Sequence, residues 1–173
     1  MSIIAIIAQV VNGFGTLVNA FGITSKDKRK TLLFFIVGNI LCALATGLLG
    51  AVAGTIILVV FVIETIINYY WEKKSDKYPI WLIALYIIVP CTILIITATS
   101  AWDILPIAAG VLFPLALVSK NFWLRLLNLA AVMVWIPYNF HFGQYVGAIS
   151  CIVFSAINAA AIIKYDIIKK KAK

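Results

Sequence analysis

Residues 26–74 read KDKRKTLLFFIVGNILCALATGLLGAVAGTIILVVFVIETIINYYWEKK, a largely apolar stretch, 31–70, between two basic clusters. At about 1.5 Å per helical residue, this stretch is long enough to cross a ~30 Å hydrocarbon core twice. Turn residues interrupt it near Thr46-Gly47 and Gly50. Because short basic loops stay on one side of a membrane, the segment predicts two transmembrane helices joined as a hairpin.

The rest of the chain alternates basic loops and apolar stretches in the same way. The 14 Lys and Arg residues fall in four clusters, at 26–30, 73–77, 120–125 and 164–173. The apolar stretches are 3–24, 31–70, 78–119 and 121–164, with breaks inside the last two at 99–103 and 140–143. The first stretch fits one span and each of the others fits two. The sequence therefore predicts an all-α integral membrane protein with seven transmembrane helices, the N-terminus outside and the C-terminus cytoplasmic.

Composition supports a membrane protein and argues against several other classes. Hydrophobic residues make up 64% of the chain and charged residues 12%, with a mean hydropathy of +1.10. The net charge of +8 lies in short loops. It therefore predicts membrane orientation and contact with the lipid bilayer, and no nucleic-acid binding. The three cysteines form no CxxC pair and no Cys/His cluster, so we expect no metal and no cofactor.

The chain also contains a weak internal repeat. A shift of 93 or 94 residues places 50–54 on 143–147, Val60-Phe61 on Val153-Phe154 and Ser25-Lys26 on Ser119-Lys120. Three spans reverse the direction of the chain and a fourth restores it, so the two triplets are predicted to be parallel. This 3+1+3 arrangement predicts a first repeat at 1–74, a linker helix at 75–102 and a second repeat with a basic tail at 103–173.

Polar side chains within the predicted spans are the candidate binding residues, because desolvation makes them costly in a membrane. In the first span, Gln9, Asn12, Thr16 and Asn19 recur at spacings of three and four, which places them on one helix face. One interpretation is the wall of a cavity that binds a polar solute. The alternative is hydrogen bonding between helices that only holds the bundle together.

The sixth span contains a second candidate group. Trp135 and Asn139 lie four residues apart on one face, and a ring beside an amide suits a flat polar solute. Tyr138 is expected in the aromatic belt at the membrane surface. In the seventh span, Asn158 is deep and requires a partner. The substrate-binding prediction therefore comprises Gln9, Asn12, Thr16, Asn19, Trp135, Asn139 and Asn158.

Three prolines and two ionisable residues complete the candidates. Pro106, Pro114 and Pro137 remove backbone donors and are predicted hinges. Glu64 is the one acid expected in the hydrocarbon region and is a proton-coupling candidate. The alternative is that Glu64 reaches the interface or pairs with a Lys or with Asn68. The single histidine, at 141, is expected to be exposed in a loop.

Three stretches resemble the YgjV family of bacterial inner-membrane proteins, over 3–165 as a whole. They are AQVVNGFGTLVNAFGITSKDKRK (8–30), DILPIAAGVLFPLALVSKNFWLR (103–125) and WIPYNFHFGQYVGAISCIVFSAINAAAII (135–163). The chain is also distantly similar to the SWEET sugar facilitators and the PnuC vitamin-precursor transporters, which share the 3+1+3 plan. Trp135 and Asn139 are similar to a Trp and Asn pairing of the PnuC group. The Pro-Gln dipeptide of PQ-loop proteins is absent, so the resemblance implies a fold more than a substrate.

These observations predict a transporter in the bacterial inner membrane. Paired carboxylates, a Ser/His/Asp set and a phosphate-binding Gly loop are missing from the predicted spans, so we do not expect an enzyme. The expected function is a facilitator or proton-coupled carrier for a sugar, nucleoside or vitamin precursor. A non-transporting receptor and an accessory or immunity-type protein on the same fold stay open as alternatives. A homo-oligomer is compatible with the sequence.

Overall fold

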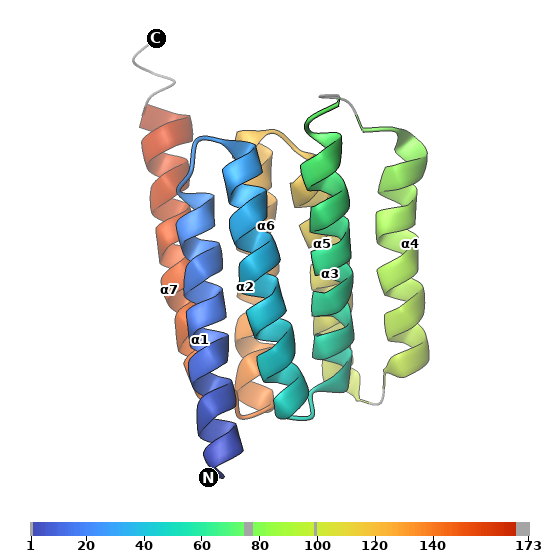
Figure 1. Ribbon diagram of the computed structural model, residues 1–173, viewed down its shortest axis with the longest axis vertical. Coiled ribbons are helices and arrows are strands. Elements are labelled where there is room, and N and C mark those ends of the chain that lie inside the picture. Colours follow the sequence, from blue (N-terminus) through green and yellow to red (C-terminus); the bar gives the residue numbers. More distant parts are fainter. Residues whose placement is uncertain (1, 75–77, 99, 169–173) are drawn as a thin grey trace.

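The computed structural model describes residues 2–74, 78–98 and 100–168, and within these ranges the chain folds into helices joined by short loops. Seven α-helices run side by side in one bundle (Figure 1). They are α1 (Ile3–Ile23), α2 (Lys28–Leu48), α3 (Val52–Trp71), α4 (Ile80–Thr97), α5 (Ile104–Val118), α6 (Asn121–His141) and α7 (Tyr145–Ala161). A 3-10 turn, η1 (Ala101–Asp103), precedes α5, and a π-helix, η2 (Ile162–Ile168), extends α7. The predicted all-α fold is confirmed.

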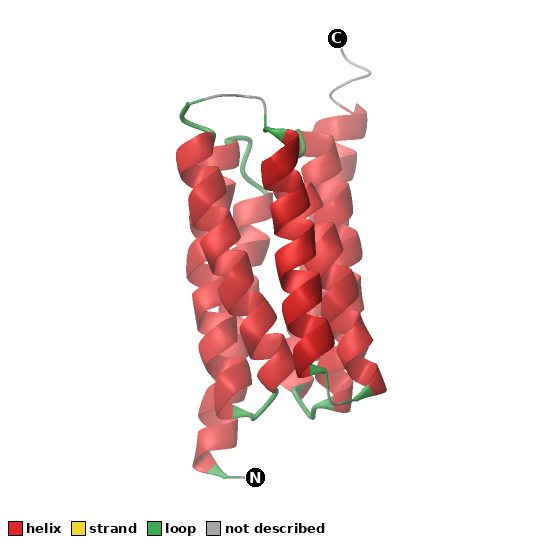
Figure 2. Ribbon diagram, turned by 90° about the vertical axis from the view of Figure 1, so that its right-hand side faces the viewer, coloured by secondary structure: helices red, strands yellow, loops and turns green. Residues whose placement is uncertain are grey.

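Local signals explain where the helices begin and end. The Ser2 hydroxyl accepts from the Ala5 N–H at the start of α1, and the Asp27 carboxylate accepts from the Arg29 N–H at the start of α2. Gly50 and Gly143 have φ values of +75° and +68°, which L side chains rarely adopt, and they form the turns after α2 and α6. Loops are thereby confined to the two ends of the bundle (Figure 2).

Six of the described helical segments are long and apolar enough to cross a membrane. These are α1, α2, α3, α4, the segment Ala101–Val118 and the segment Tyr145–Ile168. Helix α6 has the same length as α1, 21 residues, but carries polar residues such as Arg125 and Asn128 on its buried face. Those side chains lower the hydropathy of α6, and their burial shows that the helix does not turn them toward lipid.

The helices form a ring of six with one helix beside it. Going around the ring, α1 packs against α2, α2 against α3, α3 against α5, α5 against α6, α6 against α7, and α7 against α1. Helix α4 packs mainly against α3 and α5 and lies at the edge of the bundle (Figure 1). Many long apolar side chains are exposed on the outside of the ring, whereas its amides are mostly buried. This distribution is the one expected when lipid, not water, surrounds the helices.

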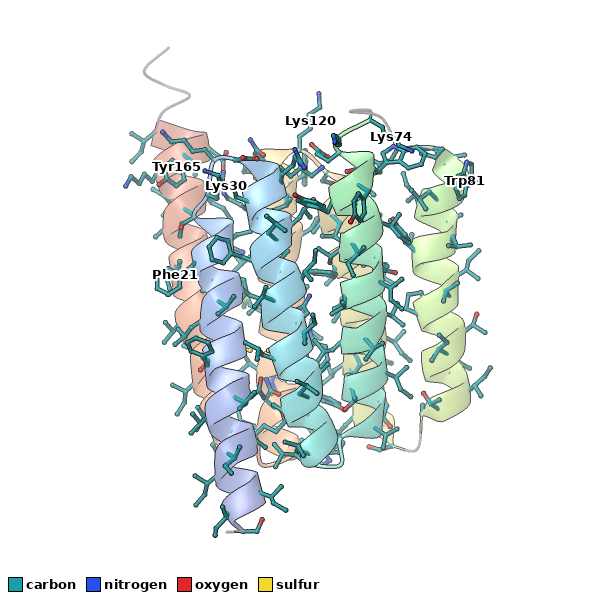
Figure 3. All side chains as sticks on the ribbon, in the orientation of Figure 1. Phe21, Lys30, Lys74, Trp81, Lys120 and Tyr165 are labelled. Carbon is teal, nitrogen blue, oxygen red and sulfur yellow. The ribbon has the colours of Figure 1, made fainter. Side chains whose placement is uncertain are left out.

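Basic residues gather at one end, which we call the basic end. The loop between α1 and α2, the last residues of α3, the start of α6 and η2 all lie at this end because successive helices alternate in direction. Lys30, Lys74 and Lys120 are seen there in Figure 3. The start of α1 lies at the opposite end, which we call the N-terminal end.

Close helix contacts depend on small residues. A Cβ added at Gly38 of α2 would lie 2.7 Å from the Gly15 carbonyl oxygen of α1, so the two backbones touch. A Cβ at Gly54 of α3 would lie 3.0 Å from the Tyr138 ring of α6. Gly38 and Gly54 thus allow close helix packing, whereas Gly50 serves a turn.

Candidate functional site

A cavity lies inside the ring, between the two ends of the bundle. Its volume is about 60 Å³. All six ring helices line it and α4 does not. The lining residues are Asn12, Thr16, Asn19, Phe35, Asn39, Cys42, Thr46, Leu58, Phe61, Phe113, Asn128, Ala131, Val132, Trp135, Asn139, Cys151 and Phe154. Uncharged side chains thus make up the described wall: amides, hydroxyls and thiols beside aromatic rings.

Three of the four polar residues predicted on α1 lie on the cavity wall. Asn12, Thr16 and Asn19 line it and are each at most 7% exposed. The Thr16 hydroxyl donates to the Asn12 carbonyl oxygen at 3.0 Å, so this side chain is partly satisfied within its own helix. Gln9 is buried but does not line the cavity; its Oε1 accepts from the Val146 N–H at 3.1 Å.

An asparagine pair joins α1 to α2 at the cavity wall. The Asn19 Nδ2 donates to the Asn39 Oδ1 at 3.0 Å. Within the described residues, the Asn19 Oδ1 and the Asn39 Nδ2 are buried without a partner. The Asn19 Oδ1 lies against Gly38, since a Cβ there would meet it at 2.1 Å. The Asn39 amide therefore has donor capacity left at the wall.

The predicted pair on α6 also lies at the cavity. Trp135 and Asn139 both line it, and the Asn139 Nδ2 donates to the Cys151 Sγ at 3.5 Å. The aromatic-belt interpretation of Tyr138 is wrong: its side chain is fully buried and its hydroxyl accepts from the Gly54 N–H at 3.1 Å. Tyr138 faces inward because the small Gly54 leaves room for a ring between α3 and α6.

A polar network closes the cavity toward the N-terminal end. The Asn12 Nδ2 donates to the Gln144 Oε1 at 2.8 Å, which ties α1 to the residue before α7. Gln144 is fully buried, and its Nε2 has no partner in the described part of the chain. The neighbouring Gly147 allows this contact, because a Cβ there would lie 2.5 Å from the Asn12 Nδ2. We call Gln9, Asn12 and Gln144 the N-terminal network.

A second network closes the cavity toward the basic end. The Arg125 guanidinium donates to the Ile23 carbonyl at 3.2 Å and to the Ser25 carbonyl at 2.9 Å, and it pairs with Asp166 at 2.7 Å. Arg125 is only 4% exposed, so this charge is neutralised in place. Asn158 of α7 belongs here: its Nδ2 donates to the Arg125 carbonyl oxygen at 3.0 Å.

Asn128 joins this basic-end network to the cavity. The Asn158 Nδ2 lies 3.3 Å from the Asn128 Oδ1, and Asn128 lines the cavity whereas Asn158 does not. Asn158 is fully buried, as expected for a deep residue with a partner. Of the seven predicted substrate-binding residues, the structure thus brings five together at the wall and places Gln9 and Asn158 in the closing networks.

The remaining candidates lie elsewhere. Glu64 is 3% exposed and does not line the cavity, and the Asn68 amide donates to its backbone oxygen, not to its carboxylate. Helices α5 and α6 continue through Pro114 and Pro137, and Pro106 lies in the first turn of α5, where a missing N–H costs little. Their roles as hinges stay predictions.

The single histidine, His141, is exposed as expected, but it is the last residue of α6 and not part of a loop; its ring stacks on Trp102 with centroids 4.4 Å apart. In the described ranges, no three His, Cys, Asp or Glu residues lie close enough to hold a metal. Cys42, Cys91 and Cys151 are free thiols.

Several residues of the site were not among the predicted ones. Asn39, Asn128, Phe113, Gln144 and Arg125 line the cavity or close it. The repeat contains a signal for two of them, because each of the four cavity residues of α2 lies 93 residues before a cavity residue of α6. The pairs are Phe35 with Asn128, Asn39 with Val132, Cys42 with Trp135 and Thr46 with Asn139.

Comparison with known proteins places the chain in a family. No curated protein and no solved structure matches it. A family model described as Imp-YgjV, bacterial inner membrane protein, matches residues 6–169, which is nearly the full length. Together with the apolar helices of the bundle, this match shows a multi-pass protein of the bacterial inner membrane. The chain belongs to the Imp-YgjV family of bacterial inner membrane proteins.

Proposed function

We propose that this protein is a transporter that carries a small uncharged polar solute across the inner membrane by way of the central cavity. The observation that carries the proposal is the cavity itself: a chamber inside a membrane bundle whose uncharged wall combines five asparagines with aromatic and aliphatic side chains, closed by a polar network at each end. Burial of amides inside a membrane is energetically unfavourable, so amides that line a chamber suggest a role in binding. The chamber lies between the two membrane faces, which suits passage of a solute.

The packing of the ring supports the predicted 3+1+3 arrangement. If α1–α3 and α5–α7 are parallel repeats, then α1 corresponds to α5, α2 to α6 and α3 to α7. The α7–α1 contact and the α3–α5 contact are then the same junction seen twice, and α4 is the linker outside the ring.

The cavity wall has the same periodicity. Besides the four pairs on α2 and α6, Leu58 and Phe61 of α3 correspond to Cys151 and Phe154 of α7, again 93 residues later. Two related halves thus present matching positions to one chamber, which is where parallel-repeat transporters bind their substrates.

The two closing networks suggest how access alternates. The N-terminal network joins α1 to the start of α7, and the basic-end network joins α6 and η2 to the loop after α1. Both networks therefore span the proposed boundary between the repeats. Movement of one half against the other would break one network while the second stays intact, so that the cavity opens to one side at a time. The positive-inside rule assigns the basic end to the cytoplasm.

The lining defines the class of solute. Because its described residues carry no formal charge, it offers no counter-ion to a charged substrate. The unpartnered Asn39 Nδ2 and the indole of Trp135 suit a hydroxyl-bearing or heteroaromatic solute, such as a sugar, a nucleoside or an uncharged vitamin precursor. The cavity of about 60 Å³ would have to expand to admit such a molecule, which fits a closed state of a carrier.

The test begins with ligand binding to the purified protein in lipid. We expect one member of a panel of sugars, nucleosides and vitamin precursors to raise the melting temperature, since a ligand at 100 times its Kd stabilises by about 2.7 kcal/mol. Trp135→Ala should abolish this shift. Trp123→Ala is the matched control, because Trp123 lies on the same helix and its side chain is 55% exposed.

Flux then separates transport from binding alone. The solute found in the first step should exchange across liposomes that contain the wild type and Trp123→Ala, but not Trp135→Ala. Binding without flux would assign the protein to the receptor class. A panel without any hit, with all variants melting alike, would favour the accessory or immunity-type function and refute the proposal.

A further inference from the structure

A second group of buried polar atoms lies outside the central cavity, between α3 and α4. Glu64 of α3 is 3% exposed, and both of its carboxylate oxygens are buried without a partner among the described residues. One turn later, Asn68 is fully buried; its Nδ2 donates to the Glu64 carbonyl at 2.8 Å, which leaves its Oδ1 unpartnered. The hydroxyl of Tyr86 on α4 is also buried and unpartnered.

The helices bring these groups to the same depth. Glu64 lies seven residues before the end of α3, and Tyr86 lies six residues after the start of α4. Both helix ends lie at the basic end, so at a rise of 1.5 Å per residue the two side chains are about 9–10 Å below it. The two helices pack against each other, and Tyr86 is only 1% exposed, so its ring lies inside the protein rather than toward lipid.

No positive charge on the neighbouring helices pairs with Glu64 in the described structure. The titratable side chains on the helices packed against α3 are Lys28, Arg29, Lys30 and Cys42 on α2 and Tyr86 and Cys91 on α4, with none on α5. Lys28 pairs instead with Glu72 at 2.9 Å, and the Arg29 guanidinium lies over the Tyr69 ring at 4.8 Å. A charge on Glu64 would therefore be buried and uncompensated, which is among the costliest states in a membrane.

One additional proton on Glu64 would supply the hydrogen-bond donor that this group of acceptors needs. With an ionised carboxylate, the unpartnered atoms of this group are three acceptor oxygens and one hydroxyl, that of Tyr86. A protonated Glu64 contributes a second donor, which suits the Asn68 Oδ1, while the Tyr86 hydroxyl suits the remaining carboxyl oxygen. The buried charge disappears, and each of the orphaned groups gains a complementary partner.

We propose that Glu64, Asn68 and Tyr86 form a proton-binding site between α3 and α4 that holds one proton on the Glu64 carboxyl. Helix α3 links this site to the cavity, because Phe61, less than one turn from Glu64, lines the chamber. Release of the proton would alter the packing of α3 on α4, and α3 forms part of the proposed boundary with α5. Coupling of the proton to solute movement rests on the proposed transport function; proton binding does not.

Infrared spectroscopy of the protein in lipid at neutral pH tests the site directly. We expect the difference spectrum between wild type and Glu64→Gln to show one carbonyl band of a protonated carboxyl, shifted in deuterated water. Glu72→Gln is the matched control, because Glu72 ends the same helix but pairs with Lys28, and its removal should leave the band in place. Tyr86→Phe should move the band to higher frequency, since it removes a hydrogen bond to the carboxyl.

The variants keep this test decisive. Tyr86→Phe reports on the wild-type carboxyl, so it tests the site even if Glu64→Gln fails to fold. Absence of the band in wild type overturns the proposal, and a sodium-dependent melting temperature that Glu64→Gln abolishes would replace the proton by a cation. Solute flux is measured separately. If the band is present but flux is absent, the proposed transport function fails while the proton site stands.

Discussion

The close contact between α1 and α2 predicts that one methyl group added at Gly38 destabilises the protein. In Gly38→Ala, the new Cβ would lie 2.1 Å from the Asn19 Oδ1 and 2.7 Å from the Gly15 carbonyl oxygen. The Asn19 side chain must move by about 1 Å to restore normal contact, which breaks its 3.0 Å bond to Asn39, and the backbone of α1 must move as well.

Three contributions determine how much Gly38→Ala changes the free energy of unfolding. Overpacking a close contact costs about 1–3 kcal/mol, and loss of an interhelical hydrogen bond in a membrane protein costs about 0.6–1.7 kcal/mol. Alanine is favoured over glycine in a helix by about 1 kcal/mol. We therefore expect the free energy of unfolding to fall by about 1–3 kcal/mol in Gly38→Ala. Denaturant titration of the protein in mixed micelles, followed by circular dichroism, measures it.

Gly47→Ala is the matched control on the same helix. The added Cβ would lie 3.5 Å from the Thr55 Cγ2, which is ordinary van der Waals contact, so only the helix preference remains. We expect Gly47→Ala to be unchanged or up to about 1 kcal/mol more stable than wild type. Equal destabilisation by the two substitutions would refute the argument, because it would show that the close approach at Gly38 does not determine the stability of this interface.

Three other predictions follow from the buried contacts and the charge distribution. Tyr138→Phe leaves the Gly54 N–H without its acceptor and should lower the free energy of unfolding by about 1–3 kcal/mol; an unchanged denaturation midpoint would contradict this. Arg125→Met should destabilise by about 3–5 kcal/mol because it leaves Asp166 as a partly buried, unpaired charge, and adding Asp166→Asn should recover part of the loss; additive effects in this double-mutant cycle would exclude coupling. A C-terminal fusion to green fluorescent protein should fluoresce and one to alkaline phosphatase should be inactive, and the reverse result would invert the proposed orientation.

Much of the candidate site could be predicted from the sequence. The stripe of Asn12, Thr16 and Asn19 and the pair Trp135 and Asn139 all reached the cavity, because polar side chains in a membrane helix turn away from lipid. The helical periodicity predicts on which face of its helix a residue lies. It does not predict which residue of another helix it contacts, or at what depth of the bundle. Gln9 shares the predicted stripe of α1, and Asn158 was predicted as a binding residue of the seventh span, yet both lie beyond the cavity in the two closing networks.

The sequence by itself determined the helices and the end of the bundle where the charges gather. These properties depend on apolar length, turn residues and loop charge, which are local along the chain. Only the tertiary structure decided the partners: Asn12 with Gln144, 132 residues apart, Arg125 with the Ile23 carbonyl, and Tyr138 with the Gly54 N–H. Tyr138 illustrates the difference, since its place near a helix end predicted the membrane surface, whereas the small Gly54 on another helix left room for it inside. Such contacts depend on the shapes of side chains from distant segments, which no local pattern contains.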